Sequence, residues 1–130
     1  VSDLSRINLT DDKDQIINKI KKAKTDTLPL PSTIEELEKR PEAKNLIGIY
    51  SSLMNNTLQE TVDEFAGKNF SEFKEKLSDV VVNEINPISL KIKELLDDKV
   101  FLEKILKDGY EKANEIASKK IKKIHEIVGF

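Results

Sequence analysis

The 130-residue sequence contains no cysteine, no tryptophan and a single histidine, His125. Without cysteine there is no disulfide framework and no cysteine-ligated zinc, which fits a reducing compartment. One histidine leaves no histidine-rich metal site and no serine–histidine–aspartate triad with members to spare. We therefore expect no metal site and no catalytic residue in this chain.

Arginine is scarce and the net charge is small. Arginine occurs only at Arg6 and Arg40, so lysine supplies the other 20 of the 22 basic residues, against 24 acidic ones. A net charge of −2 exerts no overall attraction on nucleic acid, so any RNA contact has to come from a local basic patch. The longest uncharged run, residues 45–59, is too short and polar to span a bilayer. The acidic N-terminus does not have the pattern of a signal or transit peptide.

Helical periodicity runs through nearly the whole sequence. Thr10, followed by two aspartates, predicts the start of a first helix. Its spacing places Ile16 on the inner face and turns Lys19 and Lys22 away from it. A Leu-Pro-Leu-Pro stretch cannot continue this helix, so residues 26–32 are predicted to form a rigid extended loop.

The middle of the chain predicts further helices. A short one follows Thr33, and Pro41 suits the first position of a stronger one, which we expect to be the most buried, with Leu53 and Met54 on its inner face. A Thr-Leu-Gln-Glu capping box beginning at Thr57 then opens another short helix.

The last third predicts two longer helices. The first opens at Asn69 or Ser71, and Pro87 either kinks or ends it. After a break at Asp97-Asp98, the second runs to about Val128 with one apolar stripe, and the terminal Phe130 is predicted to dock as a hydrophobic plug. No repeat or strand is indicated. We therefore predict an all-α fold, a single helical bundle of about five helices.

Three stretches resemble one family, the bacterial-type tryptophanyl-tRNA synthetases. They are SRINLTDDKDQIINKIKKAKTD (5–26), RPEAKNLIGIYSSL (40–53) and EIVGF (126–130). Their order and spacing are similar to those of the region after the KMSKS loop in that family, and the resemblance covers essentially the whole chain. It implies that residues 1–130 form a C-terminal, anticodon-binding helical domain. Residues 1–9 would connect this domain to a preceding nucleotide-binding catalytic domain.

The resemblance also implies a function. Enzymes of this family are cytoplasmic class I aminoacyl-tRNA synthetases that use ATP and Mg to attach tryptophan to its tRNA, and they are generally homodimers. Neither the HIGH nor the KMSKS signature occurs in this sequence. The chain alone is therefore expected to be inactive, with the tRNA and its own catalytic domain as partners. The alternative is a stand-alone helical adaptor that binds a protein, since any amphipathic bundle has this composition and periodicity.

A lysine cluster at the end of the first helix is the main candidate site. It contains Lys19, Lys21, Lys22 and Lys24 and leads into Asp26. Lysines neutralise phosphates, and lysine and aspartate side chains can bind the edges of unstacked bases. The alternative is a solvated helix end, where cations are favoured by the helix dipole. The resemblance favours RNA, so the predicted RNA-binding residues are Lys22, Lys24 and Asp26.

Other charged clusters indicate structural roles. Lys119, Lys120, Lys122 and Lys123, close to His125, alternate with glutamates, which is typical of an exposed surface crossed by salt bridges. The acidic groups at residues 11–14 and 97–98 are predicted to be helix caps, because nothing in the sequence suggests the apolar cleft that general acid–base catalysis needs.

Overall fold

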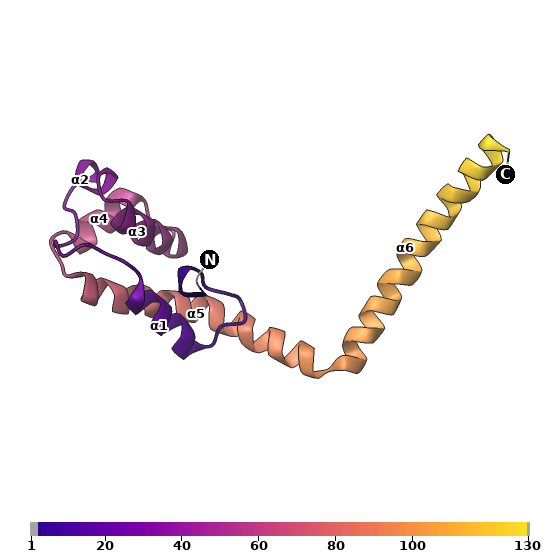
Figure 1. The fold of residues 1–130 in the computed structure, drawn as a ribbon, viewed down its shortest axis with the longest axis horizontal. Coiled ribbons are helices and arrows are strands. Elements are labelled where there is room, and N and C mark those ends of the chain that lie inside the picture. Colours follow the sequence, from indigo (N-terminus) through magenta and orange to yellow (C-terminus); the bar gives the residue numbers. More distant parts are fainter. Residues whose placement is uncertain (1–2, 130) are drawn as a thin grey trace. The chain divides into compact units, whose positions relative to one another are not determined.

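The computed structural model describes residues 3–129, and its elements confirm the all-α prediction (Figure 1). The elements are the 3-10 helix η1 (Asp3–Ser5) and the helices α1 (Lys13–Lys22), α2 (Ile34–Glu38), α3 (Pro41–Met54), α4 (Leu58–Phe65), α5 (Phe70–Asp97) and α6 (Lys99–Val128). No strand occurs among the described residues. The chain divides into two compact units, residues 1–90 and 91–130, with the boundary inside α5.

The first helix starts two residues later than the sequence predicted. Asp12, not Thr10, is its N-cap, and the Asp12 carboxylate accepts the backbone N–H of Gln15 at 2.9 Å. The Gln15 side chain in turn accepts the backbone N–H of Asp12 at 2.9 Å, which completes a capping box. Because this box satisfies two helix-end donors at once, it determines where α1 begins.

The predicted starts of the next three helices are confirmed. Thr33 caps α2, Pro41 is the first residue of α3, and Thr57 caps α4 in a capping box. Gly67 follows α4 with a φ of +69°, a left-handed conformation that glycine adopts without steric cost. Turn chemistry of this kind is local, so it could be predicted without knowledge of the fold.

The predicted opening of α5 and the break before α6 also agree with the structure. α5 begins at Phe70, directly after Asn69, and its helix continues through Pro87, which therefore does not end it. Asp98 caps α6, since its carboxylate accepts the backbone N–H of Phe101 at 2.9 Å.

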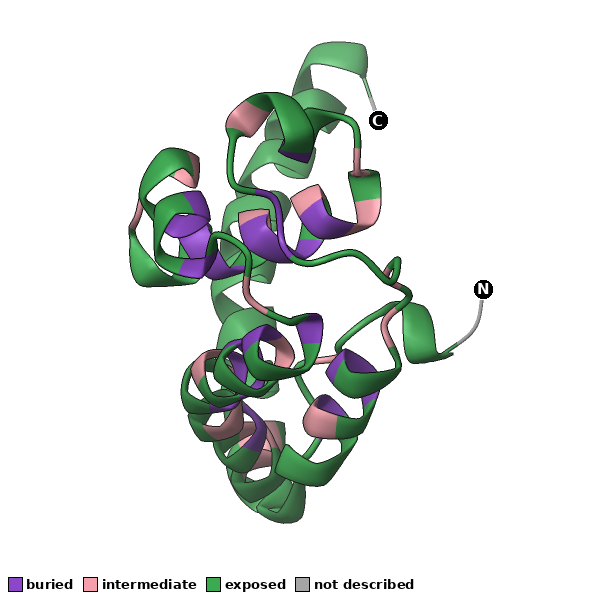
Figure 2. Ribbon diagram, turned by 90° about the vertical axis from the view of Figure 1, so that its left-hand side faces the viewer, coloured by how far each residue is buried: buried purple, intermediate pink, exposed green. Residues whose placement is uncertain are grey.

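Three aromatic rings from three helices meet in the core of residues 1–90. The Tyr50 ring of α3 lies edge-on to the Phe65 ring of α4, with centroids 5.0 Å apart. Phe65 is in turn edge-on to Phe73 of α5 at 4.8 Å. Both phenylalanines are fully buried, and Figure 2 shows the buried residues on the inward faces of these helices. The side chain of Ser51 donates a hydrogen bond to the buried Thr61 hydroxyl at 2.8 Å, which joins α3 to α4.

Periodicity overestimated burial at the end of α3 and along α6. Leu53 and Met54 are 37% and 45% exposed. No described residue of α6 is buried, including those of the predicted apolar stripe. A periodic pattern identifies which residues share a face, but it does not identify what covers that face. The predicted docking of Phe130 lies outside the described residues.

Lys19 is buried, contrary to the prediction that it turns away from the core. Its side chain is 5% exposed, and its Nζ donates to Asp11 Oδ2 at 2.7 Å and lies 3.1 Å from Asp3 Oδ2. Three residues after Ile16, Lys19 shares the inner face of α1, where the segment before α1 folds over it. Asp11 is therefore an ion-pair partner and not a cap.

The environment of this pair shifts both pKa values. Burial alone would raise the pKa of Asp11, but hydrogen bonds from Lys19 and from Asn8 hold it below its ordinary value of 3.8. The hydrogen bond to Asp11 raises the pKa of Lys19 above its ordinary 10.5, against the opposing effect of burial. Each charge thus favours the ionised form of its partner.

We predict that Phe73→Ala lowers the free energy of unfolding by about 3–5 kcal/mol, because it removes a fully buried ring of the aromatic cluster. Urea denaturation followed by circular dichroism measures the change. Met54→Ala, at an exposed position, is the control and is expected to stay within about 0.5 kcal/mol of the parent. Equal losses in the two variants would contradict the proposed centre of the core.

We also predict a pH-dependent contribution from the Asp11–Lys19 pair. Because the folded pKa of Asp11 is lowered, its stabilisation is present above pH 3.8 and is lost as the pH falls further; that of Lys19 is lost as the pH rises above 10.5. Asp11→Asn should therefore lower the urea midpoint at pH 7, and the deficit should shrink at pH 3. Asp79→Asn, which changes an exposed carboxylate, should show neither effect. A deficit of constant size from pH 7 to pH 3 would refute this assignment.

Candidate nucleic-acid interface

The segment between α1 and α2 crosses the surface of residues 1–90 as an extended loop, as predicted. Pro29 and Pro31 exclude helix here, and the side chains of Leu30 and Pro31 are buried. The backbone of Leu30 is paired on both sides: its N–H donates to the Lys68 carbonyl at 2.8 Å, and its carbonyl accepts the Gly67 N–H at 3.1 Å. The end of the loop is therefore fixed against the turn between α4 and α5.

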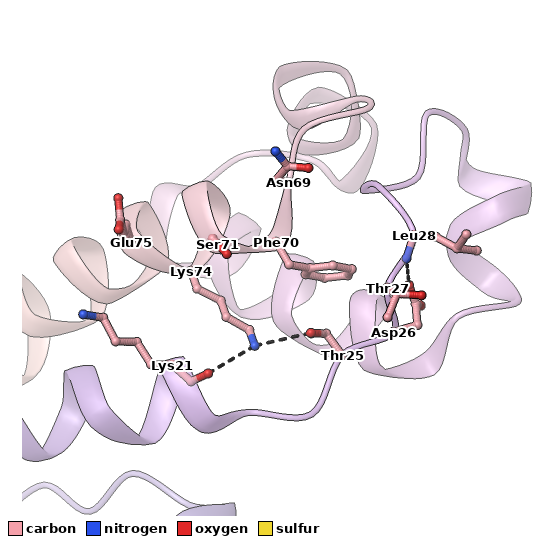
Figure 3. Close-up of a pocket in the computed structure, with 10 residues that line it drawn as sticks. All are labelled: Lys21, Thr25, Asp26, Thr27, Leu28, Asn69, Phe70, Ser71, Lys74 and Glu75. Atoms are coloured by element: carbon pink, nitrogen blue, oxygen red, sulfur yellow. Dashed lines mark hydrogen bonds between the residues drawn. The ribbon is translucent and has the colours of Figure 1, made fainter.

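Lys74 of α5 holds the start of the loop. Its Nζ donates to the Ala23 carbonyl at 2.6 Å. It also donates to the Lys21 carbonyl and the Thr25 hydroxyl at 3.3 Å each, as Figure 3 shows. These are acceptors at and beyond the C-terminus of α1, where helix carbonyls lack intrahelical partners. Burial lowers the pKa of Lys74.

Arg40, the residue before α3, holds the middle of the loop. Its guanidinium donates to both carboxylate oxygens of Asp26, at 2.8 Å and 2.5 Å. It also donates to the carbonyl of Pro29 at 2.6 Å and of Leu28 at 3.3 Å. The guanidinium carbon of Arg40 lies over the Phe70 ring, 5.6 Å from the ring centroid.

An open pocket of about 620 Å³ lies between this loop and the first turns of α5 (Figure 3). Its lining combines two lysines and two acidic residues with hydroxyl, amide and aromatic side chains. The lysine, hydroxyl, amide and aromatic groups can contact phosphate, sugar and base. The lining residues are Lys21, Thr25, Asp26, Thr27, Leu28, Asn69, Phe70, Ser71, Lys74 and Glu75.

The three predicted RNA-binding residues lie in one short segment but in different environments. Lys22 is the last residue of α1 and is exposed. Lys24 is 86% exposed and makes an ion pair with Glu42 at 3.3 Å. Asp26 is bound by Arg40 and also accepts the backbone N–H of Leu28 at 2.9 Å. The lysines are thus accessible, whereas the carboxylate is largely occupied.

Sequence reasoning missed the two residues that organise this site, Arg40 and Lys74. Both are far from the loop in sequence, and Lys74 is one lysine among many. Arg40 carried a weak signal, since it is one of two arginines and directly precedes Pro41. Neither contact could be derived from periodicity, because periodicity does not pair residues from different elements.

The second lysine cluster lies on α6 and is exposed. Lys119 makes an ion pair with Glu115 at 2.6 Å, one turn away on the same helix. This pair is of the surface type predicted for the cluster, and such pairs contribute little to stability.

No group of three or more His, Cys, Asp or Glu side chains suited to a metal occurs in residues 3–129. Within the same residues, no helix is both long and apolar enough to cross a membrane.

Comparison with known proteins places the chain beside enzymes that join an amino acid to tRNA. No family model matches it. It is 48% identical over 129 residues to the tryptophan–tRNA ligase of Agrobacterium fabrum. The matched residues make up 99% of this chain and 36% of the relative. The corresponding proteins of Caulobacter vibrioides and Rickettsia conorii are 46% and 45% identical, over 99% and 100% of the chain.

The class that these matches define is that of the aminoacyl-tRNA ligases. All three relatives are tryptophan–tRNA ligases, and nearly the whole chain is homologous to one segment of them. The chain spans between 36% and 39% of their lengths. The resemblance predicted from three stretches of sequence is thereby confirmed.

We predict that Lys74→Met destabilises residues 1–90 by about 1–3 kcal/mol, because the carbonyls beyond α1 lose a charged donor. Chemical denaturation measures the loss. Lys44→Met is the matched control, since it removes an exposed ion pair with Glu38, which is worth at most about 1 kcal/mol. If Lys74→Met costs no more than this control, Lys74 does not hold the start of the loop.

Proposed function

We propose that this chain is the tRNA-binding part of a tryptophan–tRNA ligase and that it holds the anticodon end of the tRNA. One observation carries the proposal: 99% of the chain matches, at 48% identity, about a third of a protein of that name. The relatives' remaining length leaves ample room for a separate catalytic domain. A lysine-bearing loop, held in place at three points, supports RNA as the ligand.

In this proposal the longer protein is a cytoplasmic class I aminoacyl-tRNA synthetase. It uses ATP and Mg to attach tryptophan to its tRNA and acts as a homodimer. Residues 1–130 act as one domain, with residues 1–9 as the connection to the catalytic domain. Amino-acid activation takes place in that catalytic domain, and the chain described here serves to bind and orient the tRNA.

We propose Lys22, Lys24 and Asp26 as the RNA-binding site, with the lysines as the phosphate contacts. Lys22 is exposed at the end of α1, and Lys24, itself 86% exposed, pairs with the half-exposed Glu42. Exposed ion pairs are weak, so Lys24 can exchange Glu42 for a phosphate at small cost. The pocket beside the loop, lined by Lys21 and Lys74 and not by Lys22 or Lys24, offers room for an unstacked nucleotide.

The experiment measures binding of the 130-residue chain to an anticodon stem-loop of tryptophan tRNA over a series of salt concentrations. Binding should weaken as salt rises, because phosphate contacts release counterions. The double variant Lys22→Glu/Lys24→Glu should weaken binding further and reduce the salt slope by about 2, or about 1 for each lost contact. Fluorescence anisotropy of a labelled stem-loop gives both quantities.

The control is Lys13→Glu/Lys39→Glu, which changes the net charge by the same amount at two exposed lysines outside the loop. It should leave the salt slope unchanged. Equal effects of the two double variants would show that only the overall charge matters. Failure of the parent chain to bind the stem-loop would refute RNA binding and favour the alternative, a protein-binding adaptor.

A further inference from the structure

Arg40 occupies the N-cap position of α3 without capping it. No side-chain cap hydrogen bond is made there, and the side chain, 15% exposed, extends back to the loop. It contacts three loop residues that lie 11 to 14 positions earlier in the chain: Asp26, Leu28 and Pro29. A charged side chain so extensively bonded to one loop is a structural tie between α3 and that loop.

Only arginine has the geometry for this arrangement. The guanidinium is a planar fork with five donors, so it can hold a carboxylate through two parallel bonds and still reach two carbonyls. Its face also remains available to lie over the Phe70 ring. Lysine would supply one nitrogen and no planar face, and could not make these bonds together.

The Asp26 carboxylate has little capacity left for a ligand. Its Oδ1 accepts from both Arg40 and the Leu28 N–H, and its Oδ2 accepts from Arg40, so three of about four acceptor positions are used. The hydrogen bonds from Arg40, opposed by some burial, hold the pKa of Asp26 below its ordinary 3.8, so it stays ionised. The guanidinium balances the negative charge that would otherwise repel a nearby phosphate.

We propose that Arg40 is a positioning residue for RNA binding, and that Asp26 acts through Arg40 instead of contacting a base. The Arg40–Asp26 pair fixes the backbone conformation of residues 26–29. It thereby fixes the position of Lys24, which lies two residues before Asp26. Lys74 performs the same task for residues 21–25. This inference rests on the proposed RNA-binding function, but the state of the loop can be measured without RNA.

The test compares Arg40→Lys, Asp26→Asn and the double variant in the 130-residue chain. Arg40→Lys keeps the net charge of the chain, so a change in its affinity for RNA cannot come from a change in overall electrostatic attraction. Each single variant should weaken stem-loop binding about tenfold, the equivalent of roughly one charged hydrogen bond. The double variant should bind no more weakly than either single variant, because both remove the same tie.

The salt dependence separates positioning from phosphate contact. Neither Arg40→Lys nor Asp26→Asn should change the salt slope, whereas Lys22→Gln should reduce it by about 1. Lys39→Gln, at the exposed residue beside Arg40, is the control for affinity and slope. A lowered salt slope in Arg40→Lys would show that Arg40 contacts a phosphate and would overturn the proposal. Unchanged affinity in both single variants would also overturn it.

Amide hydrogen exchange in the free chain gives an independent measurement. Both single variants should accelerate exchange at Leu28, whose N–H is bonded to Asp26, while exchange in the core of α3 stays slow. If exchange at Leu28 accelerates but the parent chain binds no RNA, the Arg40–Asp26 contact does hold the loop and only the proposed RNA-binding function fails. Unchanged exchange at Leu28 in both variants would refute the tie itself.

Discussion

The constraint on which the rest of residues 1–90 depends is the proline-containing loop between α1 and α2. Pro29 and Pro31 prevent the chain from continuing as helix and remove two backbone donors. The carbonyls that remain need partners from elsewhere, since unpaired backbone groups in a partly buried segment are costly. Arg40 supplies donors to the middle of the loop and Lys74 to its start, while the turn at Gly67 pairs with its end. Three separate parts of the fold therefore converge on one short stretch of backbone.

The charged residues fall into two groups with different physical roles. Lys19 and Arg40 are shielded from solvent and bound to carboxylates, and such charges are tolerated inside a protein only when they are paired. Lys22 and Lys24 are exposed, and an exposed charge can change partners at little cost in free energy. Net charge does not distinguish these groups, which is why a nearly neutral chain can present a local cationic site.

Homology and geometry support the proposed function from different directions. The relatives are named for an enzyme that acts on tRNA, and the chain matches a minor part of their length. The loop offers exposed lysines beside an open, mixed-polarity pocket. Rigidity matters here, because a loop held before binding loses less conformational entropy when a ligand docks.

Most of the helices could be predicted because their signals are local. The proline at residue 41 removes one of the unpaired N–H donors at a helix start, and the capping box at Thr57 and the cap at Asp98 each satisfy a backbone donor within three residues. The start of α1 was misplaced because three possible caps follow one another, and only the reciprocal bonds with Gln15 select Asp12. The positions of the candidate lysines also followed from the sequence, since helix ends attract cations.

The sequence by itself thus determined the all-α class, the extended loop, the exposure of Lys22 and, through resemblance, the relatives. Only the tertiary structure decided that Lys19 is buried, that Leu53 is exposed, and that Asp26 belongs to Arg40. The physical reason is that helix and turn formation depends on neighbours within one or two turns. Burial and ion pairing depend on which distant element arrives at the same place, and no periodic pattern encodes that.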